Sequence, residues 1–179
     1  GRPIINNPDY IKDADYLIVE STYGDKIHET YEGSTKKLIE IINKTAMRGG
    51  TVIIPSFAVG RTQELIYQLN KYYEYDPKVE EYMKIPIYID SPMAIDATEA
   101  FKRNSSSFNE EARGLVLRGD NPFQFNNLRY VRTQQESMAL NKYEFPKVII
   151  SSSGMANAGR VRHHLKHNLW DKHNSLVFV

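Results

Sequence analysis

A glutamate that directly follows an apolar run is the strongest single candidate for chemistry in the sequence. Glu20 comes immediately after Leu17-Ile18-Val19, and the polar residues Ser21 and Thr22 follow it. A carboxylate at the end of a strand can orient a catalytic histidine, act as a general acid or bind a metal. The same carboxylate could instead be a partly solvated loop residue that supports its own turn. The spacing alone leaves both interpretations open.

Two glycine-containing loops, each between an expected strand and an expected helix, are candidates for phosphate binding. One begins Ser151-Ser152-Ser153-Gly154-Met155 and reaches Arg160, and the other contains Gly60 and Arg61. Free amides at a helix N-terminus, with hydroxyl donors and an arginine, can hold a phosphate. Neither loop has a G-x-G-x-x-G or Walker pattern, so ordinary turns explain them as well. Arg61 could equally pair with Glu64 on its own helix.

Three histidines stand close together near the end of the chain. His163 and His167 have the i,i+4 spacing of a zinc-binding pair. The zincin pattern needs a glutamate directly after the first histidine, and His164 occupies that position. Because Arg162 and Lys166 lie among them, we expect a solvated basic helix face and no metal site. This helix is the best local patch for nucleic acid in the sequence.

Composition excludes several classes of protein. The chain has 179 residues, no cysteine, and 23 Lys and Arg against 22 Asp and Glu. This length suits one domain, and the absence of cysteine excludes disulfide scaffolds and thiolate zinc sites. The sequence has neither an apolar run near the ~18 residues of a membrane span nor a signal peptide. We therefore expect a soluble, cytoplasmic protein without a membrane partner.

Short β-branched runs alternate with stretches of helical period along the chain. The expected strands cover residues 15–21, 51–56, 85–90, 128–131, 147–151 and 175–179. The expected helices begin near residues 34, 62, 93 and 159, and residues 104–127 predict a short helix and a loop. Uniformly apolar strands separated by helices predict an α/β fold, a doubly wound, mainly parallel sheet with helices on both faces. The chain stops inside an apolar run at Val179, so we expect it to be cut from a longer protein.

Five segments resemble the β-CASP branch of the metallo-β-lactamase superfamily. They are Leu17–Gly24, Gly49–Glu64, Ile85–Tyr88, Asp90–Ala94 and Ser153–Met155, in this order. The strongest resemblance is to the RNA-processing nucleases that are prokaryotic homologues of the cleavage and polyadenylation endonuclease. It implies that residues 1–24 end a metallo-β-lactamase segment and that residues 25–179 form a Rossmann-like β-CASP domain.

The resemblance also implies a function. Members hydrolyse RNA phosphodiesters, as endonucleases or 5′ exonucleases, with two zinc ions held by an H-x-H-x-D-H motif and later ligands. These motifs are missing from the sequence and are expected outside it, so this chain alone should bind no catalytic zinc and cleave no RNA. Glu20 falls on the family's acidic motif, which makes it the catalytic candidate. The candidates for substrate binding are Gly60, Arg61, Ser151, Ser152, Ser153, Gly154, Met155 and Arg160. The implied partners are single-stranded RNA and the metallo-β-lactamase domain of the same protein, and a homodimer stays open.

Two other functions remain compatible with the residues. A nucleotide- or sugar-binding α/β domain, such as half of a glycosyltransferase, would use Asp90 as a ribose contact beside the glycine-containing turns. A non-catalytic pseudo-nuclease would be an interaction module, although such relatives lose motif residues and Glu20 is retained here. A nuclease parent would encode the metal motif upstream of this chain.

Overall fold

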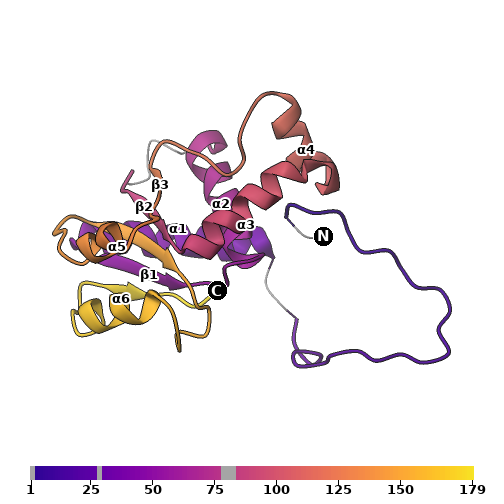
Figure 1. Cartoon of the computed structure of the whole chain (residues 1–179), viewed down its shortest axis with the longest axis horizontal. Coiled ribbons are helices and arrows are strands. Elements are labelled where there is room, and N and C mark those ends of the chain that lie inside the picture. Colours follow the sequence, from indigo (N-terminus) through magenta and orange to yellow (C-terminus); the bar gives the residue numbers. More distant parts are fainter. Residues whose placement is uncertain (1–2, 28–29, 78–83) are drawn as a thin grey trace.

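A five-stranded parallel sheet organises the chain. The computed structural model describes residues 3–27, 30–77 and 84–179, and Figure 1 shows their arrangement. The strands are β1 (Thr51–Pro55), β2 (Ile87–Asp90), β3 (Leu128–Tyr130), β4 (Lys147–Ser151) and β5 (Ser175–Leu176). Their spatial order is β3-β2-β4-β1-β5, and every pair is parallel. The parallel sheet predicted from the apolar runs is therefore confirmed.

Helices cover both faces of this sheet. They are α1 (Tyr31–Met47), α2 (Arg61–Asn70) with a π-helical turn η1 (Lys71–Tyr75), α3 (Pro92–Arg103), the 3₁₀ turn η3 (Ser105–Ser107), α4 (Glu110–Leu117), α5 (Gln134–Leu140) and α6 (Val161–Asn168). In Figure 1, α2 and α3 lie to the right of β2 and β3, and α6 lies below β1. Among the described residues, no helix combines the length and apolar character that crossing a membrane requires.

The alternation of side chains along each strand divides the core into two layers. Val148 and Ile150 of β4 belong to the large cluster that α1, α2 and α3 cover, whereas Ile149 belongs to a smaller cluster with Leu140 of α5. Successive residues of a strand point to opposite faces, so one strand supplies both layers. All five residues of β4 are buried, as expected for a central parallel strand.

Helix caps explain where two helices begin. The side chain of Thr30 accepts a hydrogen bond from the Gly33 N–H at 3.2 Å, so α1 begins at Tyr31 and the predicted start at Ser34 is wrong. Helix α5, which the apolar pattern did not predict, has a capping box between Thr133 and Glu136. This box joins two backbone N–H groups to side-chain oxygens and stabilises a helix of only seven residues.

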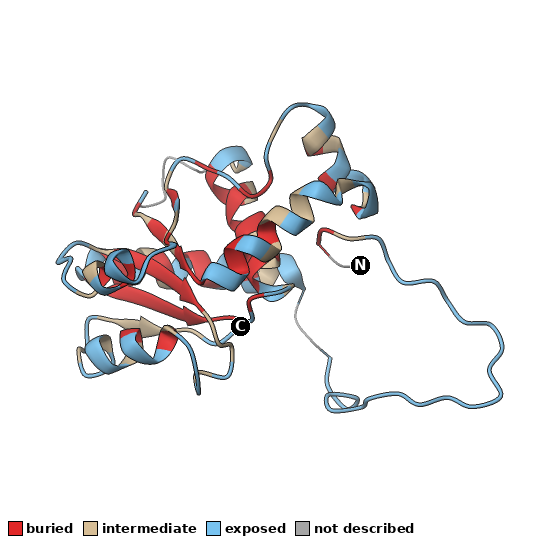
Figure 2. Ribbon diagram, viewed as in Figure 1, coloured by how far each residue is buried: buried red, intermediate tan, exposed pale blue. Residues whose placement is uncertain are grey.

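The predicted first strand is absent from the sheet. Residues 15–21 lie in an exposed extended segment, with Leu17 75% and Ile18 99% exposed. Figure 2 shows this segment in pale blue, apart from the red interior of the sheet. Before it, Ile4 is buried and Ile5 forms an antiparallel bridge with Phe108. The prediction of a buried strand over residues 15–21 is therefore wrong for this structure, in which no described segment pairs with the apolar run.

Candidate functional site

The two glycine-containing loops lie side by side at the carboxyl ends of neighbouring strands. β1 and β4 are adjacent and in register, and the Ser56 N–H donates to the Ser151 carbonyl at 3.0 Å. A Cβ added to Gly154 would come within 2.8 Å of the Phe57 ring. This close approach requires glycine at position 154. Because β1 and β4 are parallel neighbours, both loops lie at the same edge of the sheet.

Buried hydrogen bonds fix the loop after β1. The Gln63 amide, which is fully buried, donates to the carbonyls of Ala58 and Ala94 at 3.1 Å each. Its Oε1 accepts from the Gly60 N–H at 2.7 Å, where the backbone has a φ of +85°. Gln63 thereby joins the loop to α3, and it defines the path of the backbone at Gly60. These hydrogen bonds connect the loop after β1 with α2 and α3.

Arg61 pairs with the glutamate three residues later. Its Nη1 lies 2.8 Å from Glu64 Oε2, and the Arg61 side chain is 42% exposed. This pair is the alternative that the sequence left open, and an exposed pair of this kind contributes little to stability. Within the described part of the chain, the guanidinium keeps further N–H groups that Glu64 does not use, and its role as a phosphate ligand stays a prediction.

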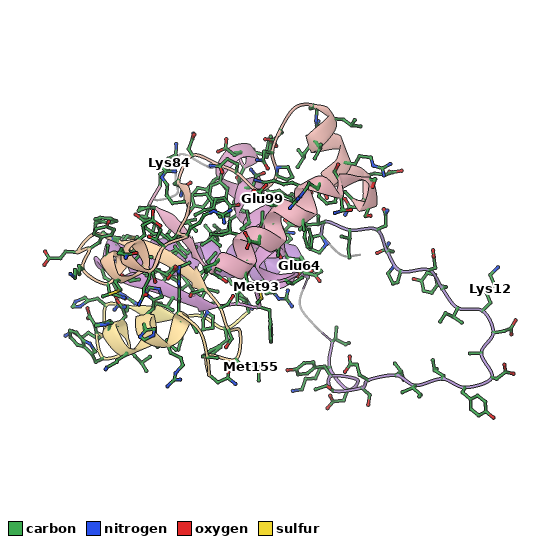
Figure 3. All side chains as sticks on the ribbon, in the orientation of Figure 1. Lys12, Glu64, Lys84, Met93, Glu99 and Met155 are labelled. Atoms are coloured by element: carbon green, nitrogen blue, oxygen red, sulfur yellow. The ribbon has the colours of Figure 1, made fainter. Side chains whose placement is uncertain are left out.

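The loop after β4 contains the serines predicted to bind substrate. The Ser151 hydroxyl donates to the Asp90 carbonyl at 2.8 Å and is buried, so it joins two strands. Ser153 Oγ bonds to Asn157 Oδ1 at 3.0 Å. Ser152 Oγ is buried and has no hydrogen-bond partner within the described part of the chain. Met155 is 70% exposed, and Figure 3 shows it at the tip of this loop.

A buried carboxylate, Asp90, holds the end of this loop in place. At the end of β2 its Oδ1 accepts from Arg160 Nη1 at 2.7 Å. Its Oδ2 accepts from Ser137 Oγ at 2.5 Å and lies 2.6 Å from His164 Nε2. Burial raises the pKa of the Asp90 carboxyl, but the hydrogen bonds from His164, Ser137 and Arg160 outweigh that effect and hold it below its usual range. The carboxylate is therefore ionised at neutral pH and fully paired.

Arg160 and His164 extend this buried network to neighbouring elements. Arg160 Nη2 donates to the Arg132 carbonyl at 2.9 Å, which connects the loop with the segment after β3. His164 Nδ1 lies 2.9 Å from Asn141 Oδ1, so oxygen atoms face both ring nitrogens. The role of Arg160 as a phosphate ligand stays a prediction. In the structure its guanidinium also holds the loop in place through Asp90 and the Arg132 carbonyl.

The expectation of a fully solvated basic face on α6 is wrong for one residue. His164 is 0% exposed, whereas His163 and His167 are exposed. Helical geometry explains the difference, because His164 lies three residues after the buried Val161 and shares its inward face. The burial of His164 and the pairing role of Asp90 were not predicted from the sequence. One usable signal was present: Asp90 follows an apolar strand in the same manner as Glu20.

Glu20 lies apart from the two loops, in the exposed N-terminal segment. Its Oε2 accepts a hydrogen bond from the Thr22 N–H at 2.9 Å, and this bond lowers the pKa of the Glu20 carboxyl. Its catalytic role stays a prediction. Within residues 3–27, 30–77 and 84–179, no group of three or more histidine, aspartate or glutamate side chains could hold a metal ion.

Exposed apolar side chains surround the two loops. They are Phe57, Val59, Met93 and Met155, each more than half exposed. Figure 3 shows Met93 and Met155 on the side of the sheet where the strands end. A group of large apolar side chains at one edge is typical of a surface that another protein segment covers.

Comparison with known proteins agrees with this geometry. The chain is 39% identical over 178 residues to ribonuclease TTHA0252 of Thermus thermophilus, spanning 99% of this chain and 40% of the relative. It is 33% identical over 166 residues to transcription termination factor FttA of Methanocaldococcus jannaschii, spanning 91% of the chain and 25% of the factor. It is 32% identical over 150 residues to endoribonuclease YSH1 of Saccharomyces cerevisiae, spanning 83% of the chain and 19% of the endoribonuclease. Residues 62–179 match the Beta-Casp domain, and the chain therefore belongs to the Beta-Casp family.

Proposed function

We propose that this chain is the substrate-positioning domain of a zinc-dependent, RNA-processing nuclease in the cytoplasm. The observation that carries the proposal is the pair of loops after β1 and β4, which meet at one edge of the sheet. In open parallel sheets this edge is where ligands bind. The names of the relatives, which include a ribonuclease and an endoribonuclease, support RNA as the substrate.

The two loops suit contacts with an RNA backbone. Amide groups at the starts of α2 and α6 place partial positive charge beside the loops. Arg61 adds a half-exposed guanidinium. Contacts of this kind position a single strand without reading its sequence. The buried bonds of Gln63 and Asp90 keep both loops in place, so binding costs little ordering of the chain.

The chemical step requires a second domain. The described residues do not fit a metal centre, so the ligands of the two zinc ions come from a metallo-β-lactamase domain of the same protein. We assign residues 1–24 to that domain and residues 25–179 to the β-CASP domain. The exposed Leu17 and Ile18 support this boundary, because a strand formed by residues 15–20 needs a sheet that the β-CASP domain does not supply.

The nucleotide-binding alternative loses its main contact. It would use Asp90 to hold a ribose, but both carboxylate oxygens are buried and accept hydrogen bonds from Arg160, Ser137 and His164. Turning this carboxylate toward a ligand would break its buried hydrogen bonds with Ser137 and His164, which costs several kcal/mol.

Glu20→Gln in the full-length protein tests the proposed function. The variant should lower the turnover of single-stranded RNA on the order of 10²-fold, because a proton-transfer or orienting carboxylate acts in the transition state. RNA affinity, measured with the metal chelated, should stay within twofold of the wild type. The matched control is Asp13→Asn on the same exposed segment, which should change neither quantity. Wild-type turnover of Glu20→Gln, or a wild-type protein that cleaves no RNA, would contradict the proposal.

A further inference from the structure

Helix α6 presents a row of residues that neither the buried network nor the two loops use. Arg162, Lys166 and Trp170 follow each other at four-residue intervals, so they share one side of the helix and its final turn. All three are exposed, and Trp170 is 80% exposed. They line one hollow of about 530 Å³ whose other walls are Ala156, Leu165 and Leu169.

A second hollow continues from the first. It has a volume of about 650 Å³, and Gly159, Arg160 and His163 line it together with Arg162 and Lys166. The two hollows therefore share two basic walls, and Gly159 belongs to the loop after β4. No acidic side chain lines either hollow among the described residues. The nearby Asp171 is hydrogen-bonded to His173 at 2.8 Å.

We propose that this face of α6 is a second binding surface for single-stranded RNA. The proposal rests on the proposed function, and it extends the RNA path from the loop after β4 along the helix. Trp170 would stack against a base, while Arg162 and Lys166 would each bind a phosphate. The charge of the two hollows favours a polyanion, and an exposed indole beside it favours unpaired bases over a duplex.

Aromatic stacking and phosphate contacts also determine which RNA this surface would bind. Stacking on an aromatic ring accepts every base, and phosphate contacts carry no sequence information. We therefore infer a surface that increases affinity for longer RNA of any sequence. A short RNA that fills only the site at the loops would not reach Trp170.

Trp170 gives a direct readout, because it is the only tryptophan among the 179 residues. Titrating this chain with an unstructured, mixed-sequence RNA oligonucleotide should quench its tryptophan fluorescence in a saturable manner. The quenching should weaken as salt increases, since binding releases counterions. Saturated RNA binding, detected by the anisotropy of labelled RNA, without any change in tryptophan fluorescence would overturn the proposal.

Variants in the full-length protein, with the metal chelated, test the surface in its natural context. Trp170→Ala should weaken binding of a long oligonucleotide on the order of 10-fold, and Trp170→Phe should retain most of the affinity because a ring remains. Arg162→Gln with Lys166→Gln should reduce the slope of log K against log salt by about 1 to 2. The control is Lys44→Gln, an exposed lysine on α1 at the opposite face of the sheet.

The outcomes separate this inference from the proposed function. If the full-length protein binds no RNA, both fail. If Arg61→Ala weakens RNA binding while the α6 variants bind long and short RNA as the wild type does, only the second surface fails. If sedimentation instead detects self-association that Trp170→Ala abolishes, and RNA affinity is unchanged, the face is a protein interface and the proposal is overturned.

Discussion

Replacing Gly159 by alanine tests whether the loop after β4 is as tightly constrained as its geometry indicates. The backbone of Gly159 has a φ of +72°, which L-residues with a side chain rarely adopt. An added Cβ would also lie 2.4 Å from the Ser152 carbonyl oxygen and 3.0 Å from its carbon. These are backbone atoms at the core of the candidate site, so the clash cannot be relieved by a side-chain rotation.

The expected loss of stability combines conformational strain with lost hydrogen bonds. The left-handed backbone costs an alanine roughly 1 kcal/mol or more. Moving the Ser152 carbonyl breaks its hydrogen bond from the Val161 N–H at 3.2 Å and disturbs that from Ser153 N–H to Ala158 at 3.2 Å. At about 1 kcal/mol for each bond, Gly159→Ala should lower the free energy of unfolding by about 3 kcal/mol.

Urea denaturation of the chain measures this loss, and Gly119→Ala provides a matched control. Gly119 has a φ of +84°, but nothing lies within 4 Å of its added Cβ. This control should therefore lose only the conformational part, about 1 kcal/mol. Equal losses in the two variants would refute the idea that contact with the Ser152 backbone constrains the loop.

The other predictions concern charged groups. Arg61→Ala in the full-length protein should weaken binding of unrelated RNA sequences similarly and reduce the salt slope by about 0.7 to 0.9. Glu64→Gln is its control, and lower thermal stability of Arg61→Ala with an unchanged slope would contradict a phosphate contact. The pKa of Asp90 is lower in the folded chain than in the unfolded chain. The ionised carboxylate therefore stabilises the fold above about pH 4, and this stabilisation is lost as the pH falls through the folded pKa. Asp90→Asn should lower the free energy of unfolding by about 3 kcal/mol or more at pH 7 and flatten its dependence on acid pH. Burial lowers the pKa of Lys147 to about 8 in the folded chain. Between about pH 8 and 10 the unfolded chain therefore binds more protons than the folded chain, and the free energy of unfolding should rise with pH by up to about 3 kcal/mol. Lys147→Met should remove that rise, and an unchanged pH profile of unfolding would contradict the assignment.

Parallel topology was the part of the fold that the sequence predicted best. The run Lys147–Ser151 forms β4 with the predicted bounds, because a central parallel strand is apolar on both faces. The meeting of the two loops follows from that topology alone. By contrast, residues 15–21 are exposed and form no strand, because an apolar pattern alone does not supply a neighbouring strand to pair with.

The buried network could not be predicted because it joins distant residues. Asp90, Ser137, Arg160 and His164 come from β2, α5, the loop after β4 and α6, and no local pattern relates them. Helix α5 was missed for a different reason, since its capping residues Thr133–Glu136 were present but its apolar periodicity is short. The general position of the site was therefore predictable, whereas the groups that hold it in place were not.

The pairing of β1 with β4 also bears on how the protein folds. Thr51 pairs with Lys147, so the two loops meet only after most of the intervening chain has been brought together. Closing so long a segment costs chain entropy, and contacts of this kind slow the crossing of the folding barrier. No local fragment can assemble this edge ahead of the rest. The surface that would receive RNA therefore depends on contacts between residues far apart in the sequence, and a fragment that lacks either strand cannot present it.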